Sequence, residues 1–302
     1  MQSWRSAVGW LIIGLLGFGL TPAWGAGPFA YRLPAGGTGI DPEAVTVVGE
    51  FQRHPLAPFE NLYEIARKYD LGFWELAAFH RELDHFYLPK TGELIIPTRW
   101  ILPSSAPAAG IVVNVGELRL YRYFPERGEV RTYPIGIGVY DYKTPFGRFQ
   151  VRAKSDKPGW RIPAGLQAKY DRTYMPPGED NPIGARWLGL NHYGIHGTHA
   201  PFGVGRLVSH GCIRTYNEDI IELFDLTPVG TPVQIIYEPV KFGFQKGRVF
   251  VEVHRDVYDK IPDLFSHTCQ LVAARQLGPL INWTRLLQAL EEQTGAPVDI
   301  SR

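Results

Sequence analysis

Proline and glycine are spread through the whole chain and limit the kinds of fold it can adopt. The 302 residues include 25 prolines and 33 glycines, residue types that interrupt helices and favour turns. This pattern indicates short strands and long surface loops, not a bundle of long helices. A chain of this length is expected to form two or three compact units. The formal net charge of +1 provides no strong field that would attract nucleic acid.

The first 25 residues have the features of an export signal. Arg5 precedes an apolar run from Ala7 to Leu20, which is followed by the small-residue pattern Ala23-Trp24-Gly25. The run is shorter than the roughly 20 residues that span a bilayer comfortably. We therefore expect cleavage after Gly25, not a retained anchor, and no membrane span in the mature chain. The protein is predicted to be exported and periplasmic.

Residues 43–99 are predicted to form a small βααβ unit. We expect strands over Val45–Val48 and Leu94–Pro97, with two helices between them that are separated by a break at Asp70–Gly72. The second helix is expected over Phe73–His80. The predicted apolar face of the first helix comprises Leu62, Ile65, Ala66 and Tyr69.

The stretch ENLYEIARKYDLGFWELAAFH followed by LIIP resembles a LysM module. The resemblance implies a domain that binds the N-acetylglucosamine-containing glycan of peptidoglycan and chitin. Phe59–Asn61 stands where such modules commonly have a Gly-Asp-Thr turn, and Phe79–Arg81 replaces the usual Asn-Pro after the second helix. A small helical packing domain is the alternative.

Residues 110–238 are predicted to form a mainly β domain with one short helix. A linker of Pro, Ala and Ser over Pro103–Ala109 precedes this domain. The helix is expected to begin at Asn217, whose side chain would cap it, and to bury Ile220 and Leu223. The expected strands are Ile111–Phe124 (two strands across a turn), Val130–Gly138, Gly147–Ala153 and Val233–Tyr237.

Two further segments are less regular. Lys154–Leu190 is rich in Pro, Gly, Trp and Tyr, and a loop this long inside a compact domain is often functional, so we expect a lid. Residues 241–302 are expected to form a small α+β appendage, with a strand over Val249–Val253 and a helix that begins after Asn282. The predicted apolar face of this helix comprises Trp283, Leu286, Leu287 and Leu290.

The segment from His192 to Cys212 contains four of the nine histidines and one of the two cysteines. One interpretation is a zinc site formed by His192, His196, His199 and Cys212, which are residue types that bind zinc. The residues between His192 and His196 are Tyr-Gly-Ile, without the Glu of a helical zinc motif. They favour a strand and turn, on which His199 points away from the other two histidines. The pattern therefore argues against a metal site.

The second interpretation is nucleophilic catalysis by Cys212. A thiol with its reference pKa of about 8.5 needs a base or positive dipoles nearby to react as a thiolate. Gly211 allows the backbone to turn where a substrate carbonyl approaches main-chain N–H groups. Arg214 is suited to hold a carboxylate through paired hydrogen bonds. A buried structural cysteine is the alternative.

The motifs IHGTH and SHGCIR, with His196 sixteen residues before Cys212, resemble the signature of YkuD-type L,D-transpeptidases. Further similarity follows the order of that family over residues 111–237. It comprises IVVNVGELRLYRYFP, PIGIG, KTPFGRF, GEDNPIGARWLGL and PVGTPVQII. With the LysM-like module before these motifs and the α+β tail after them, the chain resembles the ErfK/YbiS/YcfS/YnhG subgroup.

The resemblance implies roles for the residues of these motifs. Cys212 would be the nucleophile and His196 its base, with the backbone carbonyl of Gly197 orienting the imidazole. This agrees with the absence of any Asp or Glu between Leu190 and Cys212. Main-chain N–H groups near Gly211 and Cys212 would form the oxyanion hole. Arg214 would bind a substrate carboxylate.

Other polar residues of the motifs are expected to have lesser roles. His210 would support the site, and Ser209 is expected to form hydrogen bonds within its loop. We expect His192 at a half-buried strand position and His199 in solvent. Cys269 is interpreted as a buried or incidental thiol. Because a nucleophile must stay free, no disulfide with Cys212 is expected.

The resemblance also implies a reaction, and this reaction requires no metal or organic cofactor. Cys212 would attack the bond between the L-centre of meso-diaminopimelate and the terminal D-Ala of a tetrapeptide stem. The acyl group would pass to an amine of another stem, giving a 3→3 cross-link, or to an envelope lipoprotein. The expected partners are peptidoglycan stem peptides and glycan, and possible lipoprotein acceptors. The alternatives are an L,D-carboxypeptidase or hydrolase on the same scaffold and a non-catalytic peptidoglycan-binding envelope protein.

Overall fold

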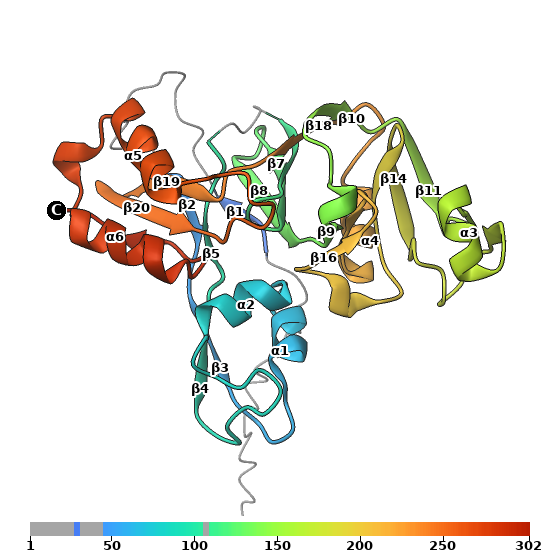
Figure 1. Ribbon diagram of the computed structural model, residues 1–302, viewed down its shortest axis with the longest axis horizontal. Helices are drawn as coiled ribbons and strands as arrows, with labels where there is room; N and C mark the ends of the chain where they lie inside the picture. Colours follow the sequence, from blue (N-terminus) through green and yellow to red (C-terminus); the bar gives the residue numbers. More distant parts are fainter. Residues whose placement is uncertain (1–26, 31–44, 105–108) are drawn as a thin grey trace, which may run out of the picture.

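The computed structural model describes residues 27–30, 45–104 and 109–302. Within these ranges, a small α/β unit, a larger mainly β unit and a C-terminal α+β unit follow one another along the chain (Figure 1). The C-terminal unit, at the left of this view, and the N-terminal unit, at the bottom, both adjoin the larger unit. The predicted export signal, residues 1–25, lies outside the described residues.

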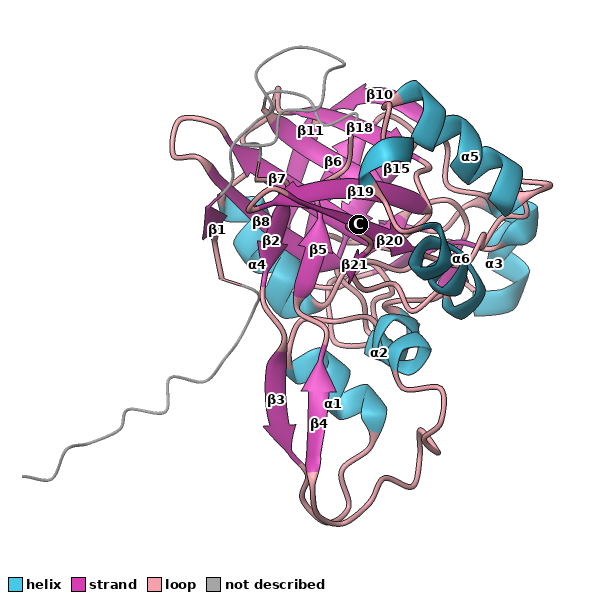
Figure 2. Cartoon of the chain, turned by 90° about the vertical axis from the view of Figure 1, so that its left-hand side faces the viewer, coloured by secondary structure: helices cyan, strands magenta, loops and turns pink. Residues whose placement is uncertain are grey.

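The N-terminal unit has the predicted βααβ order. β3 (Gln52–Pro55) pairs antiparallel with β4 (Glu93–Ile96), and α1 (Leu62–Lys68) and α2 (Phe73–Phe79) come between them in the chain. Figure 2 shows β3 and β4 as a two-stranded ribbon beside α1. Asn61 fixes the start of α1, because its side chain accepts a hydrogen bond from the Glu64 N–H at 3.0 Å. The residues of α1 that are buried are Leu62, Tyr63, Ile65 and Ala66.

The first strand of this unit does not lie at Val45–Val48, where it was predicted. Instead, β2 (Val47–Gly49) pairs with β5 (Arg99–Ile101), outside the βααβ unit. Val47 packs against Ile101 and Phe250, which explains why this position is apolar. Val47 therefore packs this N-terminal segment against the C-terminal unit.

β3 takes the place of the predicted strand. Its sequence QRHP contains no apolar alternation, because His54 is its only buried residue. The His54 ring is held between the Tyr69 hydroxyl, 3.1 Å from Nδ1, and the Glu60 carboxylate, 3.0 Å from Nε2. A strand held by a polar contact of this kind gives no periodic signal in the sequence.

The larger unit is built on a six-stranded sheet in the order β1-β8-β7-β6-β18-β10. Neighbouring strands are antiparallel except for the parallel pair β6 and β18. The hairpin predicted over Ile111–Phe124 is confirmed as β6 and β7. The strand bounds are β1 (Phe29–Ala30), β6 (Gly110–Asn114), β7 (Arg119–Phe124), β8 (Glu129–Pro134), β10 (Gly147–Gln150) and β18 (Pro232–Ile236).

A second sheet, β11-β14-β15-β17, carries His196 and Arg214, and Cys212 immediately precedes its last strand. Its last two strands are parallel, and the chain crosses between them through η2 (Pro201–Gly203) and β16, which pairs with β9. α4 (Asn217–Asp225) contacts β14 and β15 and buries Ile220 and Leu223, as predicted. The strand bounds are β9 (Ile137–Gly138), β11 (Ala153–Asp156), β14 (Arg186–Leu190), β15 (Tyr193–His196), β16 (Leu207–Ser209) and β17 (Ile213–Arg214).

The segment predicted as a lid contains a second short helix, α3 (Ala164–Tyr170), at the outer edge of the molecule (Figure 1). It lies between the paired strands β12 (Trp160–Arg161) and β13 (Tyr174–Met175). The prediction of one short helix in this unit is therefore wrong. No residue of α3 is buried, so the apolar periodicity that marks a helix is missing. A turn of 3₁₀ helix, η1 (Tyr140–Tyr142), precedes β10.

The C-terminal unit is an antiparallel sheet covered by helices. Asn282 caps the last helix by accepting a hydrogen bond from the Arg285 N–H at 3.2 Å. On this helix Leu286 is buried as predicted, whereas Trp283 and Leu287 are 42% and 49% exposed, so only half of the predicted apolar face is in the core. The bounds are β19 (Val240–Gln245), β20 (Arg248–Val253), α5 (Leu264–Ala274), η3 (Gly278–Leu280), α6 (Trp283–Glu292) and β21 (Val298–Asp299).

A buried ion pair joins the N-terminal unit to the larger one. Arg119 Nη2 on β7 lies 2.7 Å from Glu75 Oε2 on α2, and both side chains are almost fully buried. Arg119 also donates to the Asp70 carbonyl at 3.0 Å and lies over the Trp100 ring, 4.4 Å from its centroid. A core shared by the two units surrounds this pair, including Leu62 and Leu76 from the helices and Tyr121 and Tyr123 from the sheet.

Candidate functional site

Two neighbouring strands bring the two histidine motifs together. β15 and β17 are parallel, with Ile195 opposite Ile213 and His196 opposite Arg214. The Thr215 N–H donates to the His196 carbonyl at 2.9 Å and continues this ladder. Cys212 immediately precedes β17, so its thiol comes from the start of the strand that pairs with the His196 strand.

The His196 imidazole is held in one orientation by main-chain oxygen. Its Nδ1 lies 2.7 Å from the carbonyl oxygen of Gly197. A carbonyl can only accept a hydrogen bond, so Nδ1 carries the proton and Nε2 of the neutral ring keeps its lone pair. The Trp187 ring stacks on the imidazole, with the centroids 5.3 Å apart and the planes 22° apart. Gly197 is the residue whose carbonyl the resemblance implies as the partner that orients His196.

Burial keeps the His196 imidazole neutral. The residue is 4% exposed, and burial, assisted by the positive charge of Arg214, lowers the pKa of His196 to about 4. The hydrogen bond to Gly197 acts in the opposite direction but is outweighed. At neutral pH the ring is therefore a free base that can accept a proton.

The Cys212 thiol lies against β15. Burial raises the pKa of Cys212 above its ordinary value, while a main-chain hydrogen bond from Gly194 and the charge of Arg214 oppose this effect. Gly194 and His196 are two residues apart on one strand and so lie on the same face of the sheet. The resting site thus combines a protonated thiol with a neutral imidazole, rather than a thiolate with an imidazolium.

The loop before the cysteine is fixed by Ser209. Its hydroxyl donates to the Cys212 carbonyl and accepts a hydrogen bond from the Gly211 N–H at 3.2 Å, as expected for a residue that bonds within its own loop. Gly211 has a φ of 101°, and a Cβ at this position would lie 2.6 Å from the Tyr193 ring. Only glycine fits this turn. Because its N–H is bonded to Ser209, Gly211 shapes the loop more directly than it serves as a donor.

Arg214 has an unused hydrogen-bond donor beside the thiol. Its Nε is buried and has no hydrogen-bond partner among the described residues. Its main chain is fixed, since its N–H donates to the Gly136 carbonyl at 2.8 Å and its carbonyl accepts from the Gly136 N–H at 2.7 Å. A buried, positively charged donor of this kind is suited to an anionic ligand group.

His210 lies at the surface of the site. It is exposed, and its ring packs against the Tyr142 ring with centroids 4.7 Å apart. Burial and the positive charges of Lys169 and Arg214 lower the pKa of His210. Lys169 belongs to α3, and its neighbour Tyr170 interacts electrostatically with Arg214. The end of α3 therefore lies near the site, where a lid was predicted.

The residues weighed as possible zinc ligands are not grouped as a metal site in the described part of the chain. His192 is exposed in the two-residue turn between β14 and β15, where Asn191 has a φ of 67°. The expectation of a half-buried strand position for His192 is wrong, because the turn places it in solvent. His199 is exposed, as predicted. His196 and Cys212 are thus left without further ligands from this segment.

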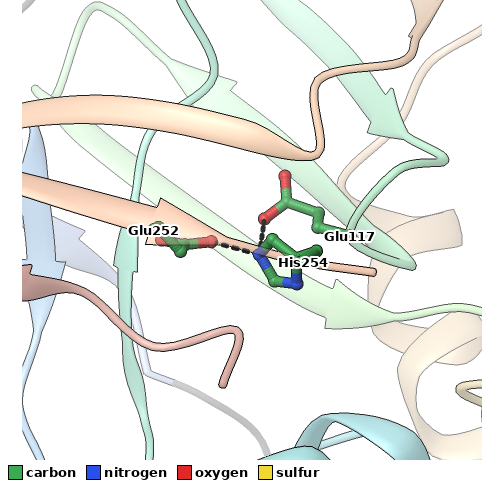
Figure 3. A group of neighbouring side chains, drawn as sticks. All are labelled: Glu117, Glu252 and His254. Atoms are coloured by element: carbon green, nitrogen blue, oxygen red, sulfur yellow. Dashed lines mark hydrogen bonds and ion pairs between the residues drawn. The ribbon is translucent and has the colours of Figure 1, made fainter. Parts of the chain in front are cut away.

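Elsewhere in the described ranges, three potential metal ligands do come together: Glu117, Glu252 and His254 (Figure 3). Their ligand atoms all lie within 4.8 Å of one another. However, Lys241 donates to Glu117, and its Nζ lies 2.8 Å from Glu252 Oε1. Burial opposes the charge of Lys241, but the two carboxylates outweigh it and raise its pKa. The Lys241 ammonium group already offsets part of the negative charge of this cluster, and we assign the cluster a structural role.

Both cysteines are free thiols. Cys269 is partly buried on α5, in the C-terminal unit. It has no histidine-glycine motif beside it, in agreement with its interpretation as an incidental thiol.

Two side chains of the site were missed or misassigned from the sequence. Trp187 was not singled out; its signal is Gly194 on the facing strand, where a Cβ would lie 2.4 Å from the Trp187 ring. Asn217 was predicted to cap α4, but Tyr216 is the N-cap residue. The Asn217 side chain instead bonds to the segments beside Gly197.

No helix within the described ranges is both long and apolar enough to cross a membrane.

The YkuD family, described as the L,D-transpeptidase catalytic domain, matches residues 108–235. "Probable L,D-transpeptidase YcfS" of Escherichia coli (strain K12) is 36% identical over 285 residues, which cover 87% of this chain and 88% of that protein. "Probable L,D-transpeptidase YbiS" of the same strain is 34% identical over 296 residues, covering 91% and 93% of the two chains.

Among solved structures, the NMR structure of the catalytic domain from the E. faecium L,D-transpeptidase covers 42% of this chain and 96% of that chain, with 26% identity and a TM-score of 0.34. The similarity to the Escherichia coli proteins extends over nearly the whole length of both partners. The chain therefore belongs to the YkuD-type L,D-transpeptidase family, in the subgroup of ErfK, YbiS and YcfS.

Proposed function

We propose that the protein is a cysteine L,D-transpeptidase that acts on the peptide stems of peptidoglycan. The observation that carries this proposal is the hydrogen bond from His196 Nδ1 to the Gly197 carbonyl at 2.7 Å. It leaves Nε2 of a neutral imidazole as a base, on the strand beside Cys212. This arrangement activates a thiol without an acidic third residue, and none is found between Leu190 and Cys212.

In the first half-reaction, Cys212 Sγ attacks the carbonyl carbon of the L-centre of meso-diaminopimelate in a tetrapeptide stem. The thiol proton passes to His196 Nε2 and then to the amine of the terminal D-Ala, which leaves. A thioester remains on Cys212. The negative charge on the tetrahedral oxygen requires main-chain donors, and we assign this role to the Cys212 N–H, with Gly211 shaping the loop.

Arg214 is the proposed carboxylate-binding residue for the substrate. Its Nε is buried and lacks a hydrogen-bond partner among the described residues, and the strand pairing places Arg214 directly opposite His196. A carboxylate of the stem would satisfy this donor. His210, at the rim of the site, would support binding through its exposed ring.

In the second half-reaction, an amine attacks the thioester and His196 accepts its proton. The amine belongs to a second stem, giving a 3→3 cross-link, or to a lysine of an envelope lipoprotein. The segment that contains α3 would exclude water, so that attack by the amine outcompetes hydrolysis. Hydrolysis would instead make the protein an L,D-carboxypeptidase.

We assign the remaining parts of the chain by the same reasoning. Residues 1–25 are proposed as a cleaved export signal, which would deliver the protein to the periplasm. The βααβ unit is proposed as a LysM-like module that binds glycan. Its β3–β4 pairing and its two helices support this proposal. The first strand of the unit is Gln52–Pro55, not the predicted Val45–Val48. The proposed catalytic domain covers 110–238 and the proposed appendage 241–302.

The proposed function is tested by incubating sacculi with the purified protein and analysing the muropeptides by mass spectrometry. A parallel reaction contains a peptide with the C-terminal sequence of an envelope lipoprotein. A transpeptidase gives 3→3 cross-linked or peptide-linked muropeptides and free D-Ala, and Cys212→Ala abolishes both. Free tripeptide stems alone would indicate a hydrolase. Binding to sacculi without any change in the muropeptides would indicate a non-catalytic envelope protein.

A further inference from the structure

The side chain of Asn217, the first residue of α4, links two segments of the chain that are far apart in sequence. Its Oδ1 accepts hydrogen bonds from the Ala185 N–H at 3.0 Å and the Thr198 N–H at 3.2 Å. Its Nδ2 donates to the Thr198 carbonyl at 2.9 Å. One carboxamide therefore satisfies three main-chain groups outside its own helix, one in Ala185 and two in Thr198.

Two glycines leave the space that this carboxamide occupies. A Cβ at Gly197 would lie 2.1 Å from Asn217 Oδ1, and a Cβ at Gly184 would lie 2.4 Å from the same atom. Gly184 also has a φ of 70°, a conformation that favours glycine. The backbone of both segments thus packs directly against the amide, with no side chain between them.

The two segments are those that contact the His196 ring. Gly197, whose carbonyl accepts from His196 Nδ1, immediately precedes Thr198. Ile183, whose main chain also interacts with the His196 ring, lies two residues before Ala185. The hydrogen bonds of Asn217 therefore fix Thr198, next to Gly197, and Ala185, two residues after Ile183.

We propose that Asn217 is a positioning residue for the reaction: its carboxamide clamps residues 184–185 to residues 197–198 and so holds the Gly197 carbonyl where it fixes the tautomer and orientation of His196. The inference rests on the proposed function, because it assigns Asn217 to the His196 base. Asn217 acts through Gly197 and does not touch the reacting atoms.

Asparagine is suited to this task because it presents an acceptor and a donor at one tip. An aspartate at this position keeps an oxygen for the two N–H groups but cannot donate to the Thr198 carbonyl. An alanine removes all three bonds and frees the Gly197 peptide group to rotate. The Nδ1–H of His196 then loses its fixed acceptor, so that both ring tautomers become populated and Nε2 is no longer reserved as the base.

The test compares N217A and N217D with a control variant, Glu222→Ala. Glu222 also belongs to α4, where it accepts hydrogen bonds from Arg131 and Tyr133, so its loss destabilises the same helix without touching the clamp. Two quantities are measured on the full-length purified proteins. One is the first-order rate constant for acylation of Cys212 by a carbapenem as a function of pH. The other is the tautomer of His196, read from ¹⁵N chemical shifts of labelled histidine.

We expect N217A to lower the acylation rate constant by about 100-fold, the effect of misplacing a catalytic group by about 1 Å, and to populate both His196 tautomers. N217D should lose about tenfold, since two of the three bonds can persist. Glu222→Ala should keep the wild-type rate within about twofold, whatever its melting temperature, and a single Nδ1–H tautomer. If N217A does not fold, the same comparison is made with N217D.

The proposal would be overturned if N217A and N217D kept the wild-type rate constant for acylation of Cys212. It would also be overturned if His196 in N217A kept a single Nδ1–H tautomer. The proposal would also be overturned if N217A and N217D lost no more of the acylation rate constant than Glu222→Ala does at the same melting temperature. Asn217 would then have only a structural role. Failure of the proposed function gives a different pattern. In that case the wild-type thiol is not acylated, whereas the effect of Asn217 on the His196 tautomer can still be observed by NMR.

Discussion

The imidazole of His196 donates from Nδ1 to the carbonyl oxygen of Gly197, the next residue in its own chain, at 2.7 Å. A backbone carbonyl carries no net charge, so it orients the ring and raises the pKa of His196 less than an aspartate would. Burial therefore dominates and holds the pKa of His196 at about 4. The base and the nucleophile of this site are both neutral before the substrate binds.

This charge state predicts how acylation depends on pH. The rate constant for acylation of Cys212 by a carbapenem should be nearly constant between about pH 5 and pH 7, and should fall as the pH decreases through about 4, where His196 becomes protonated and can no longer act as a base. Stopped-flow measurements of acylation across this range test the prediction. A midpoint near the reference value of about 6.5 would show that the ring is not desolvated as described.

Gly197→Ala should disable the site. The added methyl group would lie 2.1 Å from Asn217 Oδ1 and 3.1 Å from Ile220 Cγ2, so the segment that carries the orienting carbonyl must move. We expect a loss of acylation rate of about 100-fold or more. Gly178→Ala is the matched control, since a Cβ there meets no atom within 4 Å. Equal rates for the two variants would contradict the close packing of Gly197.

Arg214→Met should lower kcat/KM for stem peptides while changing the free energy of unfolding less. It removes a charged donor whose Nε has no hydrogen-bond partner among the described residues, and loss of a charge-assisted bond to substrate reduces kcat/KM by about 10- to 100-fold. Steady-state kinetics with a tetrapeptide stem measure the effect. Arg148→Met, at an exposed position on β10, should leave kcat/KM unchanged. An unchanged value for Arg214→Met would remove Arg214 from the substrate site.

Lys241→Met should destabilise the fold by about 3–5 kcal/mol, because it leaves two buried carboxylates without their cation. Burial already raises the pKa of Glu117 to about 7, whereas Lys241 and His254 hold the pKa of Glu252 low. Without Lys241, burial raises the pKa of both carboxyl groups above their wild-type values. The folded variant then binds more protons than the unfolded chain above about pH 4.3, so its stability should fall as the pH rises through the raised pKa values. Urea unfolding at pH 5 and pH 7 measures this difference.

The control for this prediction replaces the whole ionic group. The triple variant Glu117→Gln, Lys241→Met and Glu252→Gln removes the charges of these three residues. Part of the lost free energy of unfolding should return, without the pH dependence that the two carboxylates cause. A free energy of unfolding for Lys241→Met within about 0.5 kcal/mol of the wild type would show that the group is not structural.

The sequence alone predicted the parts of the fold that have periodic burial. The alternation in Ile111–Phe124 correctly indicated the hairpin of β6 and β7, and Leu286 on α6 was correctly placed in the core. β3 and α3 were missed because almost none of their residues are buried. The position of the first strand was wrong because Val47 packs against Phe250, a contact made about two hundred positions away in the chain.

At the site, the motif pair was sufficient to single out His196 and Cys212, and the resemblance supplied the Gly197 carbonyl. The tertiary partners of these residues were not predictable in the same way. Asn217 precedes a helical pattern, where a capping role is the natural expectation, yet its side chain bonds to two other segments. Local sequence cannot distinguish these two uses of an asparagine at the start of a helix.

The central claim is that Cys212 carries the acyl group of the stem, and intact-protein mass spectrometry tests it most directly. The protein is mixed with a tetrapeptide stem, quenched with acid within one turnover, and digested to locate the adduct. We predict a mass increase equal to the stem without its D-Ala, located on the peptide that contains Cys212, and no adduct in Cys212→Ala. Release of D-Ala by Cys212→Ala at the wild-type rate, or an adduct located on another residue, would contradict the account.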